Sequence, residues 1–191
     1  MPLEKLTRAR IVEALNLLGR RAETERVELE LCIYGGSAMM LAYGAREYTK
    51  DVDAIVRPAD VAQRLAKDVA AELRLEPDWL SDNVKRFVSI SGTFAPLEIQ
   101  GLEESARRHL KITRPSASYL LAMKCLACRP STPGYPGDVE DIRFLVRKMG
   151  LRTVAEVEAH IERFYPTDAL TSESRAVVER ILADSAEREN E

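Results

Sequence analysis

Two acidic residues, Asp51 and Asp53, stand two positions apart in the segment DVDAIV. In a strand, residues i and i+2 point to the same side, so both carboxylates would share one face and Val52 the other. Adjacent like charges repel each other unless water or a divalent cation screens them. The pair therefore predicts either a solvated edge strand or a Mg²⁺ site whose metal would also contact substrate phosphates.

A glycine turn precedes the acidic pair, because Gly35, Gly36 and Ser37 follow an apolar run that ends at Tyr34. Glycines at the start of a helix let a ligand approach the backbone, and the unpaired N–H groups there attract phosphate oxygens. The Ser37 hydroxyl would be one more donor. Alone, this segment also fits a simple strand-to-helix turn. Followed by the acidic pair, it favours a site that binds substrate phosphates together with a divalent cation.

Other phosphate and metal patterns do not fit. The chain has neither G-x-x-x-x-G-K-[ST] nor a G-x-G-x-x-G after a predicted strand. A calcium loop that began at Asp51 would need glycine at its sixth position, where the sequence has Val56. Cys125 and Cys128 lie within a predicted helix and lack the further ligands of a zinc site.

Three more polar residues lie in the second half of the chain. Lys124 interrupts an apolar helical run, so it must extend to solvent, pair with a carboxylate or contact a ligand. Asp138 and Asp141 are three positions apart at the start of the next predicted helix. That position also suits a simple N-cap and a favourable contact with the helix dipole.

Periodicity places these residues on a mixed α/β scaffold. A strand is predicted at 27–34, where alternation gives way to a continuous apolar run, and a second at 51–56, where the residues alternate. Helical patterns cover 4–21, 37–43, 61–75, 116–129, 138–149, 153–164 and 174–188. Between them, 85–94, 96–102 and 110–113 read as strands. We therefore expect an α/β core over 1–114 and a helical half over 115–191 packed on it as one unit.

The composition is that of a folded domain. The 191 residues are 46% hydrophobic and 31% charged with a net charge of −3, which excludes collagen-like and wholly disordered chains. No apolar run approaches the roughly 20 residues of a membrane helix, and the first residues do not form a signal peptide, so we expect a cytoplasmic protein. Arginine outnumbers lysine 21 to 7, which suits phosphate recognition if the arginines cluster.

Four segments together resemble the nucleotidyltransferase-fold families related to AbiEii toxins, over about 27–165: GGSAMMLAYGAREYTKDVDAIV, PDWLSDNVKRF, YLLAMKCLACRP and DVEDIRFL. The resemblance implies a polymerase-β-like minimal nucleotidyltransferase core with a mixed sheet. It also implies Mg²⁺-dependent transfer of a nucleoside monophosphate from a nucleoside triphosphate to an acceptor hydroxyl. Some relatives are toxins that act on the 3′ end of tRNA, so tRNA or another RNA and a cognate antitoxin are implied partners.

Carried over residue by residue, the resemblance assigns three groups of side chains. It places metal binding and catalysis at Asp51 and Asp53. It places the triphosphate at Gly35, Gly36, Ser37 and Thr49. Lys124, with Asp138 or Asp141, would complete the nucleotide site, Lys124 and Asp141 with catalytic roles.

The fold usually has a third acid on a later strand, for which Glu98 is the best-placed candidate in this sequence. Without that acid, transfer with a single metal stays open, and so does binding without turnover: a catalytically silent nucleotide sensor or partner-binding module is the alternative to an enzyme. Any RNA would have to be bound by the catalytic unit itself, because little of the chain is left for a separate RNA-binding domain. We therefore expect the arginines to cluster beside Asp51 and Asp53.

Overall fold

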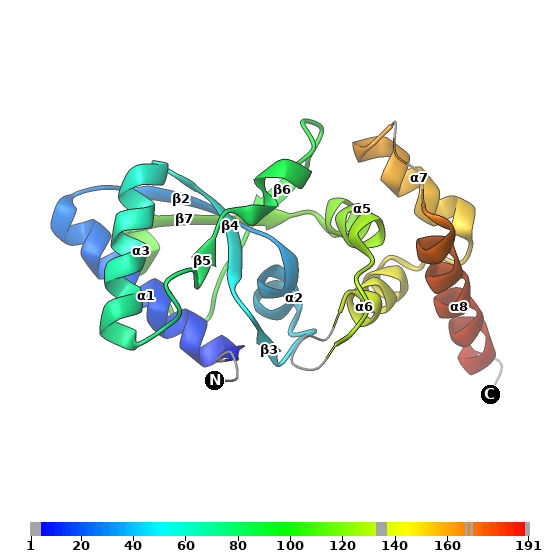
Figure 1. Ribbon diagram of the computed structural model, residues 1–191, viewed down its shortest axis with the longest axis horizontal. Helices are drawn as coiled ribbons and strands as arrows, with labels where there is room; N and C mark the ends of the chain where they lie inside the picture. The colour runs from blue at the N-terminus through cyan, green and yellow to red at the C-terminus, as the bar shows by residue number, and fades with distance from the viewer. Residues whose placement is uncertain (1–4, 133–136, 167, 169, 190–191) are drawn as a thin grey trace. The chain divides into compact units, whose positions relative to one another are not determined.

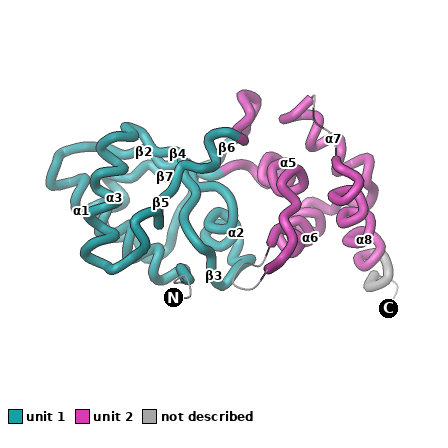
Figure 2. Tube along the Cα trace, viewed as in Figure 1, with its two compact units in different colours: residues 1–86, 94–114 teal, residues 87–93, 115–191 magenta. Residues whose placement is uncertain are grey.

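The computed structural model describes residues 5–132, 137–166, 168 and 170–189. The chain forms two compact units, one of residues 1–86 and 94–114 and the other of residues 87–93 and 115–191 (Figure 2). The division differs from the sequence prediction at residues 87–93. These residues belong to unit 2 because the Ser89 backbone N–H donates to the Tyr119 hydroxyl and the Ser89 hydroxyl donates to the Phe164 carbonyl.

Unit 1 is a mixed sheet with helices packed on it (Figure 1). Its helical elements are α1 (Arg8–Glu25), α2 (Gly35–Tyr43), α3 (Ala59–Leu73), the 3₁₀ turn η1 (Asn83–Phe87) and α4 (Glu104–His109). Its strands are β1 (Leu6–Thr7), β2 (Leu29–Ile33), β3 (Tyr48–Thr49), β4 (Val52–Arg57), β5 (Leu80–Ser81), β6 (Phe94–Pro96) and β7 (Leu110–Pro115). Both η1 and β7 end one residue inside unit 2.

The main sheet has the strand order β5-β4-β2-β7-β6, and β1 and β3 form a separate two-stranded sheet. Strand β2 runs antiparallel to β4 and parallel to β7, while β4 runs parallel to β5. Helix α1 packs against α3 and α4, and α2 packs against β3 and β4. The predicted mixed α/β class and mixed sheet are therefore confirmed.

Strand β4 shows how the alternating sequence sets the position of the acids. Val52, Ala54 and Val56 are buried, whereas Asp51 and Asp53 are only partly buried, which is the two-residue period of a strand with one covered face. The β4 backbone is held on one side by β2 and on the other by the bond from the Val52 N–H to the Trp79 carbonyl. The two carboxylates consequently lie on the same face.

The two strands predicted over 85–94 and 96–102 are borne out only in part, by the short strand β6 of the main sheet. In place of two strands the structure has η1, the three-residue β6 and irregular chain. Leu97 and Ile99 are buried at alternate positions, which is the sequence pattern of a strand, but both residues follow the end of β6 and lie outside any strand. Helix α4 was not predicted, because six residues are too few to show a helical period.

Unit 2 is helical, with α5 (Ala117–Ala127), α6 (Val139–Met149), α7 (Val154–Phe164) and α8 (Ser172–Glu189). Helix α5 packs against α6 and α7, and α8 contacts α5, α6 and α7. Thr153 and Glu156 form the predicted capping box, and Gly150 ends α6 in the left-handed conformation. Within the described residues, no helix is long and apolar enough to span a membrane.

Candidate functional site

The acidic pair lies where β2 gives way to α2. Ile33, the last residue of β2, pairs with Ala54, and the Tyr34 N–H donates to the Asp53 carbonyl at 2.8 Å. The chain then turns at Gly35 into α2. The Asp53 backbone is thus fixed beside the first turn of this helix.

Gly35 brings the Asp53 carboxylate close to the start of α2. Its φ is +60°, in the left-handed region that favours glycine, and a Cβ added there would lie 2.9 Å from Asp53 Oδ2. No larger residue fits at this position without displacing the carboxylate. The predicted glycine turn and the predicted acid are therefore direct neighbours.

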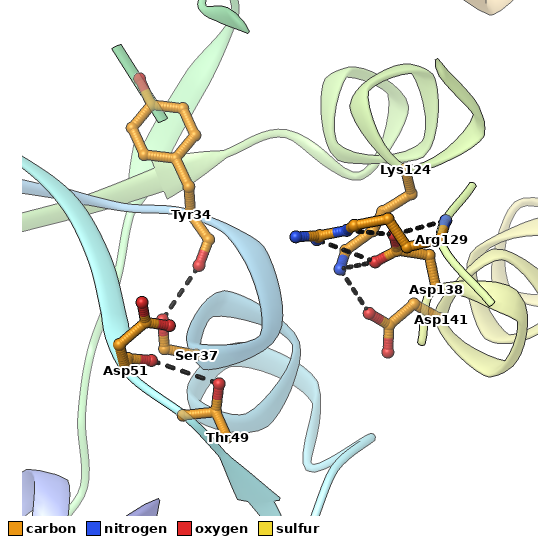
Figure 3. A network of polar contacts seen from close by, with 8 residues as sticks. All are labelled: Tyr34, Ser37, Thr49, Asp51, Lys124, Arg129, Asp138 and Asp141. Atoms are coloured by element: carbon orange, nitrogen blue, oxygen red, sulfur yellow. Dashed lines mark hydrogen bonds and ion pairs between the residues drawn. The ribbon is translucent and has the colours of Figure 1, made fainter. Parts of the chain in front are cut away.

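Two polar side chains lie close to Gly36. A Cβ there would lie 3.0 Å from Thr49 Oγ1 and 3.1 Å from an Arg46 guanidinium nitrogen. The Thr49 hydroxyl donates to the Asp51 carbonyl at 3.2 Å (Figure 3). A hydroxyl and a guanidinium thus meet at the first turn of α2, where backbone N–H groups have no helical partner. Arg46 was not among the predicted site residues.

The structure gives Ser37 a different role from the expected one. Its side chain is fully buried, and its hydroxyl donates to the Tyr34 carbonyl at 3.0 Å (Figure 3). The single hydroxyl proton is therefore used inside the first turn of α2 rather than presented to a ligand. What remains for an anion at Ser37 is its backbone N–H.

The two carboxylates repel each other. Burial, followed by the negative charge of Asp53, raises the pKa of Asp51 from 3.8 to about 6, although Lys50 acts in the opposite direction. The Ser81 hydroxyl lies 3.1 Å from Asp53 Oδ1 and 3.5 Å from Asp51 Oδ2. Two hard oxygen ligands that are kept close at an electrostatic cost suit a divalent cation, which would neutralise both.

The site has two carboxylates rather than three. Glu98 follows β6, two strands lie between β4 and β6 in the sheet, and the Glu98 side chain is exposed. Within the described part of the chain, no group of three or more His, Cys, Asp or Glu side chains could hold a metal ion. The donor set therefore fits a cation bound by two acids, and Glu98 is not a third ligand.

A second polar cluster, which we call the Lys124 network, lies in unit 2 and comprises Lys124, Arg129, Asp138 and Asp141 (Figure 3). The Lys124 ammonium lies 2.6 Å from Asp138 Oδ1 and 2.7 Å from Asp141 Oδ2. Asp138 Oδ2 also accepts bonds from the Arg129 backbone N–H and Nε. Two cations and two carboxylates thus balance in charge.

The Lys124 network changes the interpretation of Asp138. Asp138 occupies the N-cap position of α6 but makes no side-chain capping bond, so the predicted simple cap is wrong. Burial would raise the pKa of Asp138, but the Arg129 hydrogen bonds and the Lys124 charge outweigh it and lower the pKa to about 2. An ammonium has three N–H donors, so Lys124 has at most one left for a ligand.

Several arginines of unit 1 lie away from the acidic pair, in ion pairs on the helices. Five of them, on the helices α1, α3 and α4, form ion pairs with carboxylates: Arg10, Arg20, Arg21, Arg64 and Arg108. Arg46 is the arginine that the structure places beside Gly36. These ion pairs do not support a cluster of arginines around Asp51 and Asp53.

The predicted residues thus form two groups. Gly35, Gly36, Thr49 and the two acids converge in unit 1, whereas Lys124, Asp138 and Asp141 converge in unit 2. Sequence reasoning missed Arg46 and Ser81, which lie outside the glycine turn and the acidic pair. Comparison of the chain with models of known protein families, with curated proteins and with solved structures found no match. Support for a function must therefore come from these residues.

Proposed function

We propose that the protein is a Mg²⁺-dependent nucleotidyltransferase, which moves a nucleoside monophosphate from a nucleoside triphosphate to an acceptor hydroxyl. The observation that carries the proposal is the contact between the Asp53 carboxylate and the glycine turn at Gly35. The start of a helix, which suits an anion, and an acid on a strand, which suits a cation, are there adjacent, and a metal-bound triphosphate would need both.

Each side chain of unit 1 has a distinct part in this proposal. Backbone N–H groups at Gly36 and Ser37 would hold phosphate oxygens, and the Arg46 guanidinium would offset their charge. Asp51 and Asp53 would hold Mg²⁺, which supplies charge neutralisation at the reacting phosphate. The attacking hydroxyl oxygen forms a bond to the α-phosphorus, pyrophosphate leaves and the hydroxyl proton passes to solvent. Catalysis would then consist mainly of positioning and electrostatics.

The roles expected of Lys124, Asp138 and Asp141 remain part of the proposal. Their contacts in unit 2 equally suit a structural network, because each charge already has an opposite partner. The RNA acceptor, the toxin activity and a cognate antitoxin rest on the family resemblance. The ion-paired arginines of unit 1 lend the RNA acceptor no further support.

The test is a labelling assay with purified protein, Mg²⁺ and each of the four α-labelled nucleoside triphosphates, with total tRNA and with protein as acceptors. We expect label transfer that is lost in Asp53→Asn. It should persist in Asp60→Asn, a matched control because Asp60 is an exposed acid in the first turn of α3. A folded protein that labels no acceptor with any nucleotide contradicts the proposal.

The two-carboxylate donor set favours one alternative, a protein that binds nucleotide without turnover. A sensor needs the glycine turn but not a strongly held metal. Calorimetry with each triphosphate separates the two functions. Binding that survives Asp53→Ala in a protein without transferase activity supports the sensor, whereas binding and labelling that both fail in Asp53→Ala support the enzyme.

A further inference from the structure

Strand β5 brings one more oxygen to the acidic pair. Ser81 pairs with Asp53 in the parallel β4–β5 ladder, and side chains at paired positions point to the same face. The Ser81 side chain is 9% exposed, and its hydroxyl lies 3.1 Å from Asp53 Oδ1 and 3.5 Å from Asp51 Oδ2. One hydroxyl thus lies against both carboxylates.

The position of Ser81 is fixed by its neighbours. Trp79 is buried, and its indole N–H donates to the Ala66 carbonyl at 2.9 Å. The Trp79 carbonyl accepts the Val52 N–H at 2.6 Å. These bonds tie β5 to α3 and to β4, so the register that places Ser81 opposite Asp53 does not depend on the two-residue strand alone.

The hydrogen bonds to the two carboxylates do not use the lone pairs of the Ser81 hydroxyl oxygen. A hydroxyl has one proton, so it can donate to only one of the two carboxylates at a time, while its oxygen carries two lone pairs. Those lone pairs make it a hard oxygen donor like the carboxylates. Serine and threonine hydroxyls bind Mg²⁺ in the same manner beside the phosphates of P-loop proteins.

We propose that Ser81 is the third protein oxygen of the cation site, taking the place of a third carboxylate. The inference rests on the proposed function, because it concerns the cation that Asp51 and Asp53 would hold. Two charges and one neutral oxygen would bind a divalent cation more weakly than three carboxylates. The remaining positions would stay open to water and phosphate oxygens, as Mg²⁺ sites commonly require.

The experiment measures cation binding by the full chain without nucleotide. Mn²⁺, a magnetic substitute for Mg²⁺, is titrated into the protein, and the free ion is measured by electron paramagnetic resonance. Cd²⁺ is then added and the displaced Mn²⁺ is measured. This readout ignores Cd²⁺ that binds elsewhere, including at the native cysteines. The proteins are wild type, Ser81→Ala, Ser81→Cys, Asp53→Asn and Ser105→Cys, the last a matched thiol on α4.

We expect Ser81→Ala to weaken Mn²⁺ binding about 10-fold or more, a typical loss when a group that supports a metal site is removed. In Ser81→Cys, Cd²⁺ should displace Mn²⁺ at about 10-fold lower concentration than in wild type, because a thiol prefers soft cations. Ser105→Cys should behave as wild type. Thermal unfolding of each variant checks that it is folded. Ser81→Cys should fold like wild type, because cysteine is nearly isosteric with serine.

The outcomes separate the two proposals. Unchanged Mn²⁺ affinity in Ser81→Ala, or equal Cd²⁺ displacement in wild type and Ser81→Cys, overturns the role of Ser81 and leaves the proposed function intact. If wild type does not bind Mn²⁺, or if Asp53→Asn binds Mn²⁺ as well as wild type does, the cation site itself is absent. Both the proposed function and the role of Ser81 then fail.

Discussion

The Asp53 carboxylate lies so close to Gly35 that a Cβ on residue 35 would be 2.9 Å from Asp53 Oδ2. Strand β4 thus approaches the start of α2 closely at this position. This close approach couples the conformation of the glycine turn to the position of an acid. Any change that enlarges residue 35 should therefore move Asp53, even though residue 35 has no chemistry of its own.

Gly35→Ala should lower stability and also abolish the cation and nucleotide binding that depends on Asp53. An alanine at φ +60° costs about 1–2 kcal/mol, and the contact with Asp53 adds to this cost. Urea unfolding measures the first effect and calorimetry with a triphosphate and Mg²⁺ the second.

Gly44→Ala is the matched control for this prediction. Gly44 ends the same helix at φ +63°, and nothing lies within 4 Å of a Cβ added there. We expect a similar backbone cost of about 1–2 kcal/mol with unchanged ligand binding. Equal losses of stability and equal binding in both variants would show that the Asp53 contact is unimportant.

The raised pKa of Asp51 predicts a specific pH dependence in the metal-free protein. Because the folded pKa is about 6 and the ordinary value is 3.8, the folded state binds more protons between these values, and stability falls as pH rises from about 4 to 6. Asp51→Asn removes this loss. At pH 7 we expect it to stabilise the metal-free protein by about 1–2 kcal/mol, allowing for partial solvent screening.

Divalent cations should offset the loss of stability that the ionised Asp51 causes in the metal-free protein. Binding of Mg²⁺ requires the ionised carboxylate, so the rise in melting temperature caused by Mg²⁺ should be large at pH 7.5 and small at pH 5. Asp51→Asn should show little Mg²⁺-dependent shift at either pH. A wild-type shift of the same size at both pH values would contradict the ionisation of Asp51 as its cause.

The sequence was sufficient for the parts of the site that have local signals. Strict alternation placed Asp51 and Asp53 on one face of β4, and Gly35 marked the turn into α2. Ser81 could not be found in this way, because β5 has two residues and no recognisable period. Its place opposite Asp53 follows from the β4–β5 register, which is set by contacts between distant segments.

Asp138 illustrates a different failure. An aspartate before a helix ordinarily caps it, and the sequence supports that interpretation. In the structure the fully buried carboxylate instead pairs with Lys124 and Arg129, because a buried carboxylate without a cation would be far more costly than a helix end without a side-chain cap. Local capping preference was thus overridden by the charge balance of the core.

The Lys124 network should be important for the stability of unit 2. Asp138→Asn removes a charge that meets both Lys124 and Arg129, and breaking a buried pair from one side costs about 3–5 kcal/mol. Denaturant unfolding measures the loss. The control is Asp82→Asn, which removes the exposed Asp82–Lys85 pair and should change stability by less than about 1 kcal/mol.

The low pKa of Asp138 also predicts how the stability that this residue contributes changes at acid pH. A folded pKa of about 2, below the ordinary value of 3.8, stabilises the protein above pH 4, and this contribution disappears as pH falls toward 2. The difference in stability between wild type and Asp138→Asn should therefore shrink over that range. A difference that stays constant from pH 5 to pH 2.5 would mean that the Asp138 charge is not its source.

Arg46 provides a test of the anion side of the site in unit 1. Its guanidinium lies beside Gly36, where phosphate oxygens would approach the backbone N–H groups. Hydrogen bonds to charged groups contribute about 1.5–3 kcal/mol, so Arg46→Ala should weaken triphosphate binding about 10-fold or more. Arg64→Ala, which removes an exposed ion pair with Glu25 on the helical side of unit 1, should leave the affinity unchanged. Calorimetry with a non-hydrolysable triphosphate measures both, and equal affinities in the two variants would remove Arg46 from the nucleotide site.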